Sequence, residues 1–383
     1  MRIIADENIP CVEKAFASLG DVVLLPGRDL QPEQVRDADI LLVRSVTRVD
    51  QALLQGSSVR FTGSATIGFD HVDRDYLTQQ GIGFATAPGC NATSAAEYVV
   101  SALLTISDKK NFSLSGKTIG IIGCGNVGSR VRVKLAALGM TCIINDPPLA
   151  AAGDGGTFVE LDEALQADIV TLHVPLSNSG AHPTYHLVDA AALQKLRPGA
   201  VLVNTSRGAV VDNHALNTLL EHRDDLSVIL DVWEDEPAIN VSLLEKVDLG
   251  TPHIAGYSLD GKLRGTDMIY RAACEYFGEN IQWDVADVLP SGPSIELDAS
   301  MHTDMATIIR TAVLGNYDVR ADDARLRELP GLVPNERPDY FDRLRKEYPV
   351  RREFSETRVM VDGLTDELER VLCQLGFPVA VCA

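Results

Sequence analysis

The chain lacks the features of a disulfide-bonded, zinc-binding or membrane-spanning protein. Its seven cysteines are scattered and none belongs to a Cys-x-x-Cys pair, which fits neither a disulfide framework nor a zinc site. No apolar run approaches the roughly 20 residues that span a bilayer, and the first residues lack the apolar stretch of a signal peptide. We therefore expect a cytoplasmic protein without a bound metal, in which most cysteines are small buried hydrophobic residues.

Basic residues are also few. The chain has 34 lysines and arginines against 54 aspartates and glutamates, which gives a formal net charge of −20. Nucleic acids and anionic membranes need a net basic face on their partner, so we expect neither as a partner. A small anionic ligand is compatible with this charge where basic residues gather locally, because salt screens the wider field beyond roughly 8–10 Å.

The order of apolar segments predicts two α/β domains. Over residues 1–87, short apolar runs alternate with helix-like stretches in the β-α-β rhythm of a parallel sheet. A long helix rich in small residues is predicted over 91–108. A second β-α series with six predicted strands then covers 118–251, which is enough for a complete doubly wound sheet.

The pattern breaks near residues 290–293, and a third segment follows. Its order predicts a small α+β unit of alternating strands and helices. The strands are predicted at 294–298, 353–361 and 378–382, and the helices at 305–314 and 365–375. Such a unit is too small to bury much core alone, so we expect it to pack against a second subunit.

A glycine loop lies between a predicted strand, 118–122, and a predicted helix, 129–138. Its residues are Gly123, Cys124, Gly125, Asn126, Val127 and Gly128. In this context the first glycine makes the turn, the second lets a pyrophosphate approach the backbone, and the third lets helix and strand pack closely. The helix N-terminus adds N–H groups for the phosphates. The loop therefore predicts a dinucleotide site.

Asp146 ends the next predicted strand, about twenty residues further along the chain. A carboxylate at this position accepts hydrogen bonds from both hydroxyls of an adenosine ribose, and it repels a 2′-phosphate. The sequence therefore favours NAD over NADP as the cofactor.

Three polar residues at predicted strand ends have the chemistry of an oxidoreductase. His253 follows the strand 247–251 and precedes the small residues Ala255 and Gly256. Hydride transfer from an alcohol requires removal of the hydroxyl proton, and an imidazole titrates close to neutral pH. We therefore predict that His253 is the proton acceptor.

A carboxylate and an arginine complete the predicted set. Glu236 is the best placed acid to hold the imidazole tautomer, with Glu234 and Asp235 as alternatives in the same acidic turn. Arg207 follows the predicted strand 200–204, at the carboxyl edge of the sheet where ligands bind. Its guanidinium can hold a substrate carboxylate and the adjacent oxygen together.

The glycine loop followed by this arginine, glutamate and histidine resembles the D-isomer-specific 2-hydroxyacid dehydrogenase family over roughly residues 40–275. The resemblance implies that Arg207, Glu236 and His253 are catalytic. It also implies a set of residues around NAD beyond the glycine loop, namely Asp146, Val174, Ser206, Arg207, Asp231 and Gly256. Val174 departs from the pattern, since many relatives carry threonine there, so one side-chain hydroxyl contact is lost.

The family resemblance implies a Rossmann NAD-binding domain, 93–254, inserted into a flavodoxin-like substrate domain formed by 1–92 and 255–285. The residues 87–92 and 253–266 and the extra C-terminal unit resemble, more narrowly, a branch that oxidises a phosphorylated 2-hydroxy acid. That branch is homodimeric through its C-terminal domain, here 286–383. The narrower resemblance implies substrate contacts from Ser45, Thr66 and Tyr257.

Basic residues for a phosphate group are present in the Arg44–Arg48 loop, of which Arg44 is the predicted substrate contact. Two other functions are compatible with the same motifs. One is a dehydrogenase acting on glycerate or phosphoglycerate. The other is a non-catalytic, NAD-sensing protein of the corepressor type, against which the intact catalytic trio argues.

Overall fold

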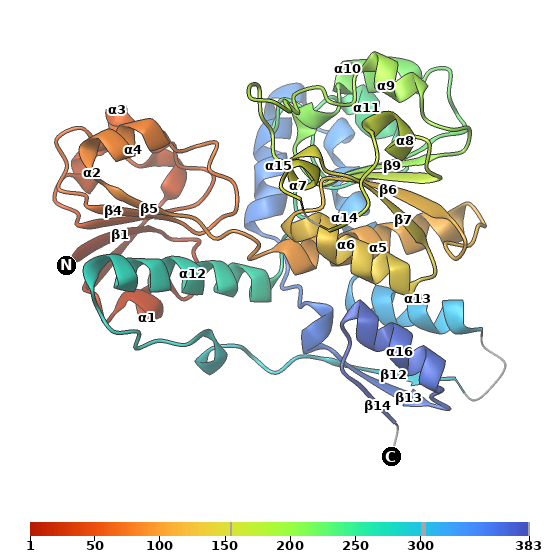
Figure 1. The fold of residues 1–383 in the computed structure, drawn as a ribbon. Helices are drawn as coiled ribbons and strands as arrows, with labels where there is room; N and C mark the ends of the chain where they lie inside the picture. Colours follow the sequence, from red (N-terminus) through yellow and green to blue (C-terminus); the bar gives the residue numbers. More distant parts are fainter. Residues whose placement is uncertain (154, 300–303, 382–383) are drawn as a thin grey trace. The chain divides into compact units, whose positions relative to one another are not determined.

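The computed structural model describes residues 1–153, 155–299 and 304–381, and contacts divide the chain into two units (Figure 1). The first unit comprises Met1–Asn91 and Ser258–Ser291, and the second comprises Ala92–Tyr257 and Gly292–Ala383. The C-terminal segment, from Gly292, therefore groups with residues 92–257, which contain the predicted NAD-binding domain. The finer domain limits given above stay a prediction.

The first unit is built on a five-stranded parallel sheet with the order β2-β1-β3-β4-β5, which is the flavodoxin-like order. The strands are β1 (Arg2–Asp6), β2 (Asp21–Leu25), β3 (Ile40–Val43), β4 (Phe61–Ser64) and β5 (Gly83–Ala85). The inner strand β3 is buried along its whole length, which explains its unbroken apolar character. The helices are α1 (Val12–Phe16), α2 (Pro32–Val35), α3 (Gln51–Leu54), α4 (Arg74–Gln80) and α12 (Leu259–Phe277).

Helix α12 begins at Leu259. Ser258 caps it, because its Oγ accepts a hydrogen bond from the Gly261 N–H at 2.9 Å. Gly261 and Gly265 within the helix obscure this start in the sequence, since glycine disfavours helix interiors. The helix ends at Gly278, which has a φ of 72°.

The second unit contains a six-stranded parallel sheet with the order β11-β10-β9-β8-β6-β7. Its strands are β6 (Thr118–Ile122), β7 (Thr141–Asn145), β8 (Ile169–Leu172), β9 (Val201–Asn204), β10 (Ser227–Leu230) and β11 (Leu249–Gly250). Its helices are α5 (Ala92–Lys109), α6 (Asn126–Ala137), α7 (Pro147–Ala151), α8 (Leu161–Ala164), α9 (Ala190–Gln194), α10 (Asn213–Leu219) and α11 (Val241–Lys246). The two predicted parallel sheets are thus confirmed. Because β7 and β8 flank β6 on opposite sides, the strand order reverses at β6, and ligands of such sheets bind at the carboxyl ends of the strands at this point.

The C-terminal segment forms three parallel strands, β12 (Ser294–Asp298), β13 (Arg358–Asp362) and β14 (Val379–Val381). The predicted strand 353–361 starts too early, because Phe354–Glu356 form a 3₁₀ turn. Cys382, at the end of the third predicted strand, lies outside the described residues. The helices are α13 (Met305–Asn316), α14 (Val319–Leu326), α15 (Arg337–Lys346) and α16 (Asp366–Leu375). Helices α14 and α15 were not predicted, because their charged residues leave only a weak apolar stripe.

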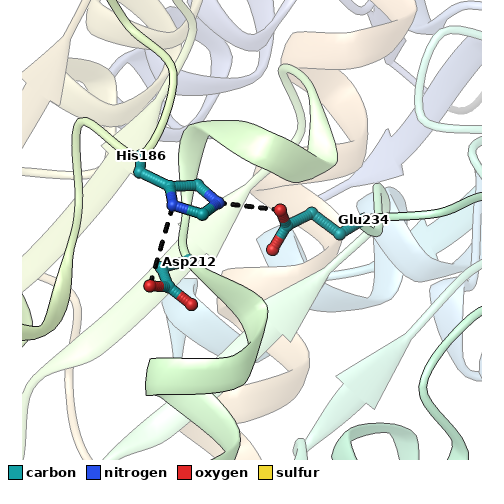
Figure 2. Close-up of side chains that lie close together, drawn as sticks. All are labelled: His186, Asp212 and Glu234. Atoms are coloured by element: carbon teal, nitrogen blue, oxygen red, sulfur yellow. Dashed lines mark hydrogen bonds and ion pairs between the residues drawn. The ribbon is translucent and has the colours of Figure 1, made fainter.

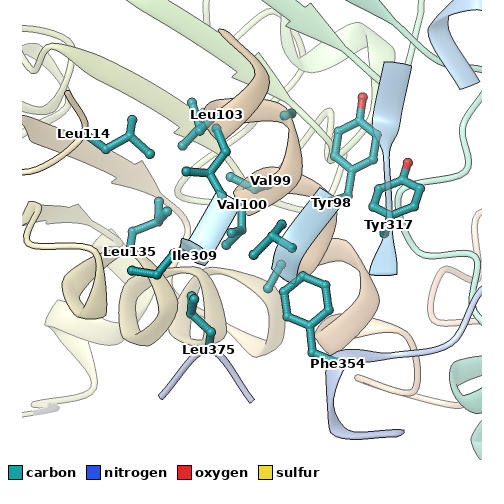
Figure 3. Packing of buried hydrophobic residues seen from close by; sticks show 14 of the residues in the cluster. Tyr98, Val99, Val100, Leu103, Leu114, Leu135, Ile309, Tyr317, Phe354 and Leu375 are labelled. Carbon is teal, nitrogen blue, oxygen red and sulfur yellow. The ribbon is translucent and has the colours of Figure 1, made fainter. Parts of the chain in front are cut away.

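The apolar side chains of the C-terminal segment pack against helices α5 and α6 of the same unit (Figure 3). Leu375 of α16 and Ile309 of α13 belong to the same buried cluster as Val100 of α5 and Leu135 of α6. A second subunit is therefore not needed to supply this core, and the homodimer rests on the family resemblance. Among the helices of the described residues, none has both the length and the apolar character to cross a membrane.

Candidate active site

The three loop glycines have different structural roles. Gly123 has a φ of +87°, which an L-residue rarely adopts, and a Cβ on Gly128 would lie 2.0 Å from the carbonyl oxygen of Gly123. A Cβ on Gly125, in contrast, would meet no atom within 4 Å. The first and third glycines are thus required by the turn and by packing, while the second leaves the backbone open to a ligand.

The start of helix α6 suits a diphosphate. Gly125 is its N-cap residue and supplies no side-chain cap, so the first-turn N–H groups remain oriented toward the loop. Together with the open surface above Gly125, this arrangement fits the dinucleotide that the motif predicts.

Asp146 directly follows β7 and joins the two neighbouring loops. Its Oδ2 accepts a hydrogen bond from the Cys124 N–H at 2.7 Å, and its Oδ1 accepts one from the Leu149 N–H at 3.0 Å as the N-cap of α7. The residue is partly exposed. Each carboxylate oxygen keeps a second lone pair, so the side chain fits the predicted ribose contact while it also fixes the glycine loop.

Val174 and His173 follow β8 at the same edge. Val174 faces the glycine loop, since its Cγ1 lies 2.8 Å from the position of a Cβ on Gly123. His173 is held between two hydroxyls, with Thr171 Oγ1 2.9 Å from its Nε2 and Thr205 Oγ1 3.2 Å from its Nδ1. Burial lowers the pKa of His173 to about 3, so the ring is neutral at cellular pH.

The loop after β9 carries Ser206 and Arg207. Asn204 shapes it, because its side-chain amide donates to the Arg207 carbonyl at 2.9 Å and its Oδ1 accepts from the Ser206 hydroxyl at 2.8 Å. The partly exposed Arg207 donates from Nη1 to the Ser206 carbonyl at 2.7 Å. A Cβ on Gly208 would lie 1.9 Å from the Trp233 carbonyl. The arginine loop therefore packs directly against the segment that leads to Glu236.

Glu236 and His253 form a hydrogen-bonded pair. His253 Nδ1 lies 2.7 Å from Glu236 Oε2, and the other oxygen of Glu236 accepts from the Trp233 N–H at 2.7 Å. Burial by itself raises the pKa of Glu236, but His253 and these hydrogen bonds outweigh it, so the pKa is lowered. An ionised Glu236 that accepts the Nδ1 proton leaves the Nε2 lone pair to accept a proton from a ligand.

The backbone around His253 is held in an unusual conformation. His253 has a φ of +57°, which is uncommon for a residue other than glycine and is typical of functional sites. The buried Asp231, directly after β10, holds this loop by accepting hydrogen bonds from the Ile254 N–H at 2.8 Å and the Ala255 N–H at 2.9 Å. Asp231 thus has a clear structural function, and its implied contact with the cofactor stays a prediction.

Glu234 contacts a different histidine (Figure 2). His186 Nε2 lies 2.7 Å from Glu234 Oε1, and His186 Nδ1 lies 3.7 Å from Asp212 Oδ2. Asp235 between the two glutamates has a φ of 60°. One ligand atom from each of His186, Asp212 and Glu234 lies within 4.8 Å of the other two, a spacing that could hold a metal ion. The sequence analysis did not anticipate this cluster, since its three residues lie far apart in the chain.

Gly256 and Tyr257 continue the His253 loop, and the C-terminal segment supports them. The Gly256 carbonyl accepts from the Ser94 hydroxyl at 3.1 Å, and the Tyr257 ring packs edge-on against Tyr348 with centroids 5.6 Å apart. Arg351 donates from Nη1 to the Ala255 carbonyl at 3.1 Å. Arg351 was not among the predicted site residues, because no local pattern connects it to a loop almost a hundred positions away.

The other predicted substrate residues, Arg44, Ser45 and Thr66, belong to the first unit. Thr66 Oγ1 lies 2.8 Å from Ser64 Oγ, Ser45 is exposed, and Arg44 is partly exposed. Burial and the charge of Arg44 lower the pKa of Lys262 to about 8. Two cations thus lie near each other in this unit, a feature suited to an anion.

Sequence comparison relates both halves of the second unit to known families. Residues 94–255 match the NAD-binding domain of the D-isomer-specific 2-hydroxyacid dehydrogenases. Residues 288–376 match a domain of unknown function. The second unit therefore contains an NAD-binding domain, in agreement with the cofactor predicted from the glycine loop and Asp146.

Known proteins resemble the chain over nearly its whole length. It is 46% identical to the erythronate-4-phosphate dehydrogenase of Hahella chejuensis, with 98% of this chain and 99% of the relative aligned. It is 47% identical to the enzyme of that name from Escherichia coli strain UMN026, with 98% of each chain aligned.

Solved structures share the fold. The NAD- and lactate-bound D-lactate dehydrogenase of Aquifex aeolicus aligns with a TM-score of 0.60 and 25% identity, covering 73% of this chain and 96% of the other. The NAD-bound 3-phosphoglycerate dehydrogenase of Entamoeba histolytica aligns with a TM-score of 0.63 and 23% identity, covering 74% of this chain and 98% of the other. The chain belongs to the D-isomer-specific 2-hydroxyacid dehydrogenase family and groups within it with the erythronate-4-phosphate dehydrogenases.

Proposed function

We propose that the chain oxidises C2 of 4-phospho-D-erythronate with NAD, giving 3-hydroxy-2-oxo-4-phosphooxybutanoate, a step in the biosynthesis of pyridoxine 5′-phosphate. The hydrogen-bonded His253–Glu236 pair is the observation that carries the proposal, because it supplies an oriented base in an NAD-binding unit. The substrate follows from the erythronate-4-phosphate dehydrogenases to which the chain is similar over 98% of its length.

His253 accepts the proton of the C2 hydroxyl at Nε2, and Glu236 stabilises the imidazolium that forms. Arg207 binds the substrate carboxylate and the C2 oxygen, which orients C2 and polarises its bond to oxygen. NAD held in the cofactor site would supply the acceptor for the hydride of C2. The hydroxyl proton leaves to His253 and the hydride to the cofactor, so C2 becomes a carbonyl carbon.

The cofactor site in this proposal combines the glycine loop with the loops after β7 to β11. Gly123, Gly125, Asn126, Val127 and Gly128 cradle the diphosphate, and Asp146 binds the adenosine ribose. The remaining contacts come from Val174, Ser206, Arg207, Asp231 and Gly256. Val174 offers its backbone and not a hydroxyl, so one contact of the threonine-bearing relatives is replaced.

The proposed substrate contacts are Arg44, Ser45, Thr66 and Tyr257. The Arg44–Lys262 neighbourhood supplies positive charge in a chain of net charge −20, which a phosphorylated substrate needs. In the same proposal 1–92 and 255–285 are the substrate domain, 93–254 the cofactor domain and 286–383 the dimerisation domain of a cytoplasmic homodimer. Light scattering on the full chain tests the dimer, and a monomeric mass contradicts it.

Turnover tests the function directly. The purified chain should reduce NAD in the presence of 4-phospho-D-erythronate, with a kcat/KM above that for D-glycerate, 3-phosphoglycerate and unphosphorylated erythronate. His253→Ala should abolish turnover while NADH fluorescence still reports binding. A higher kcat/KM for glycerate or phosphoglycerate would show that this acid, and not 4-phospho-D-erythronate, is the substrate. NAD binding without turnover of any of these acids would favour the non-catalytic sensor.

A further inference from the structure

Arg345 places a guanidinium from the C-terminal segment at the His253 loop. It lies in helix α15, inside the stretch that matches a domain of unknown function. Its side chain is 17% exposed and lies near the side chain of Tyr257, which raises the pKa of Arg345. Tyr257 follows His253 by four positions, so Arg345 reaches the same loop as the proposed base.

The hydrogen-bonding capacity of Arg345 is only partly used. Its Nε is buried and has no hydrogen-bond partner among the described residues. Asp342 Oδ1 lies 3.8 Å from Nη1, which is an ion pair but too long for a hydrogen bond. A buried donor without a partner costs free energy, which a bound anion would recover.

Arg345 stays charged in this environment. Burial by itself lowers the pKa of Arg345, but Tyr257 and Glu236 outweigh it, so the pKa is raised. The two oxygens of Glu236 already accept hydrogen bonds from His253 and the Trp233 N–H, and the charge of Arg345 also helps to lower the pKa of Glu236. Arg345 therefore contributes positive charge beside the proposed catalytic pair.

Two other arginines of the C-terminal segment serve as comparisons for Arg345: Arg351 is buried, and Arg343 is exposed. Arg351 is 5% exposed, stacks over the Tyr317 ring at 3.6 Å and donates to the carbonyls of Ser94 and Ala255. Arg343 is exposed and lies over the Tyr340 ring at 5.1 Å. The Nε of Arg351 is likewise buried without a hydrogen-bond partner, so what sets Arg345 apart from both is its position beside Tyr257, a proposed substrate residue.

We propose that Arg345 is a substrate-binding residue that, together with Tyr257, holds the phosphate group of the substrate. The proposal rests on the proposed function, in which the substrate has two anionic ends. Arg207 binds the carboxylate, so the phosphate requires cations of its own, and a guanidinium matches phosphate oxygens with paired N–H donors. The domain of unknown function thereby gains a role in substrate selection.

The test compares two substrates that differ only in the phosphate. The expected result for Arg345→Gln is a loss of roughly 10- to 100-fold in kcat/KM for 4-phosphoerythronate, the range of a charge-assisted hydrogen bond, with little change for erythronate. Arg345→Lys should restore part of the loss, since a lysine keeps the charge but not the fork. Arg343→Gln, in the same helix, is the matched control and should leave both values near those of the wild type.

A binding measurement separates this proposal from the proposed function. Inorganic phosphate, titrated calorimetrically into the NADH-loaded full chain, should bind more weakly to Arg345→Gln than to the wild type, whether or not phosphoerythronate is turned over. Failure of the wild type to oxidise phosphoerythronate overturns the proposed function alone. Equal losses on both substrates, or unchanged phosphate affinity, overturn the role of Arg345. Loss of phosphate selectivity in Arg44→Gln but not in Arg345→Gln assigns the phosphate to the first unit and likewise overturns it.

Discussion

Glu236 holds His253 through a 2.7 Å contact from Oε2 to Nδ1, while its other oxygen accepts the Trp233 N–H. One carboxylate oxygen thus fixes the imidazole, and the other fixes the carboxylate itself to the backbone. Replacing Glu236 by glutamine keeps the shape but removes the negative charge that stabilises the imidazolium. We expect kcat to fall about 10²-fold, with little change in the KM for NAD. Steady-state kinetics with both substrates varied measures this.

Glu234→Gln is the matched control for this substitution. Glu234 lies two residues away but contacts His186, with a distance of 2.7 Å. Its replacement should reduce kcat far less than that of Glu236. An equal or larger loss in Glu234→Gln would show that the carboxylate pairing seen here is not the one that supports turnover.

This pair also shows where prediction from sequence stops. The strands were predictable because parallel strands buried on both faces form unbroken apolar runs, and the glycine loop because its spacing has a physical cause. The choice among Glu234, Asp235 and Glu236 was not predictable from the sequence. The turn, in which Asp235 has a φ of 60°, directs the neighbouring acids to different histidines. The contributions of Arg345 and Arg351 depend on tertiary packing and leave no local signal.

Two glycines of the cofactor loop should respond differently to alanine. A Cβ on Gly128 would lie 2.0 Å from the Gly123 carbonyl oxygen, so Gly128→Ala should destabilise the fold by roughly 1–3 kcal/mol. A Cβ on Gly125 would meet nothing within 4 Å, so Gly125→Ala should lose less stability but bind NADH more weakly. Urea unfolding and NADH fluorescence titration separate the two effects. Equal unfolding midpoints for both variants would contradict the packing argument.

His173 should contribute to acid sensitivity. Burial lowers its pKa to about 3 in the folded chain, whereas an unfolded histidine has a pKa of about 6.5. Between these values the unfolded state binds a proton that the folded state does not, so stability is complete above about pH 6.5 and falls as the pH drops toward 3. Because His173 keeps some exposure, the slope should lie below the limit of about 1.4 kcal/mol per pH unit.

The measurement is a series of urea unfolding curves between pH 7 and pH 4 for the wild type and His173→Gln. Glutamine retains a hydrogen-bonding side chain but does not titrate, so the variant should lose stability less steeply with acid. All other titrating groups are common to both proteins and cancel in the comparison. Parallel stability curves across this range would contradict a neutral, buried His173.

Arg351 is expected to position the loop that carries His253. Its two hydrogen bonds to the carbonyls of Ser94 and Ala255 and its stacking on Tyr317 tie the C-terminal segment to this loop. Arg351→Met keeps the apolar bulk but leaves two buried carbonyls without their donor, which should cost roughly 3–5 kcal/mol of stability. Well below the unfolding temperature of the variant, kcat should fall while the KM for NAD stays near its wild-type value, because the glycine loop is untouched.

The control variant is Arg343→Met, at an exposed position of the same segment, which should change neither the stability nor kcat. If Arg351→Met lost stability but retained the wild-type kcat, the arginine would hold the C-terminal segment in place without positioning His253.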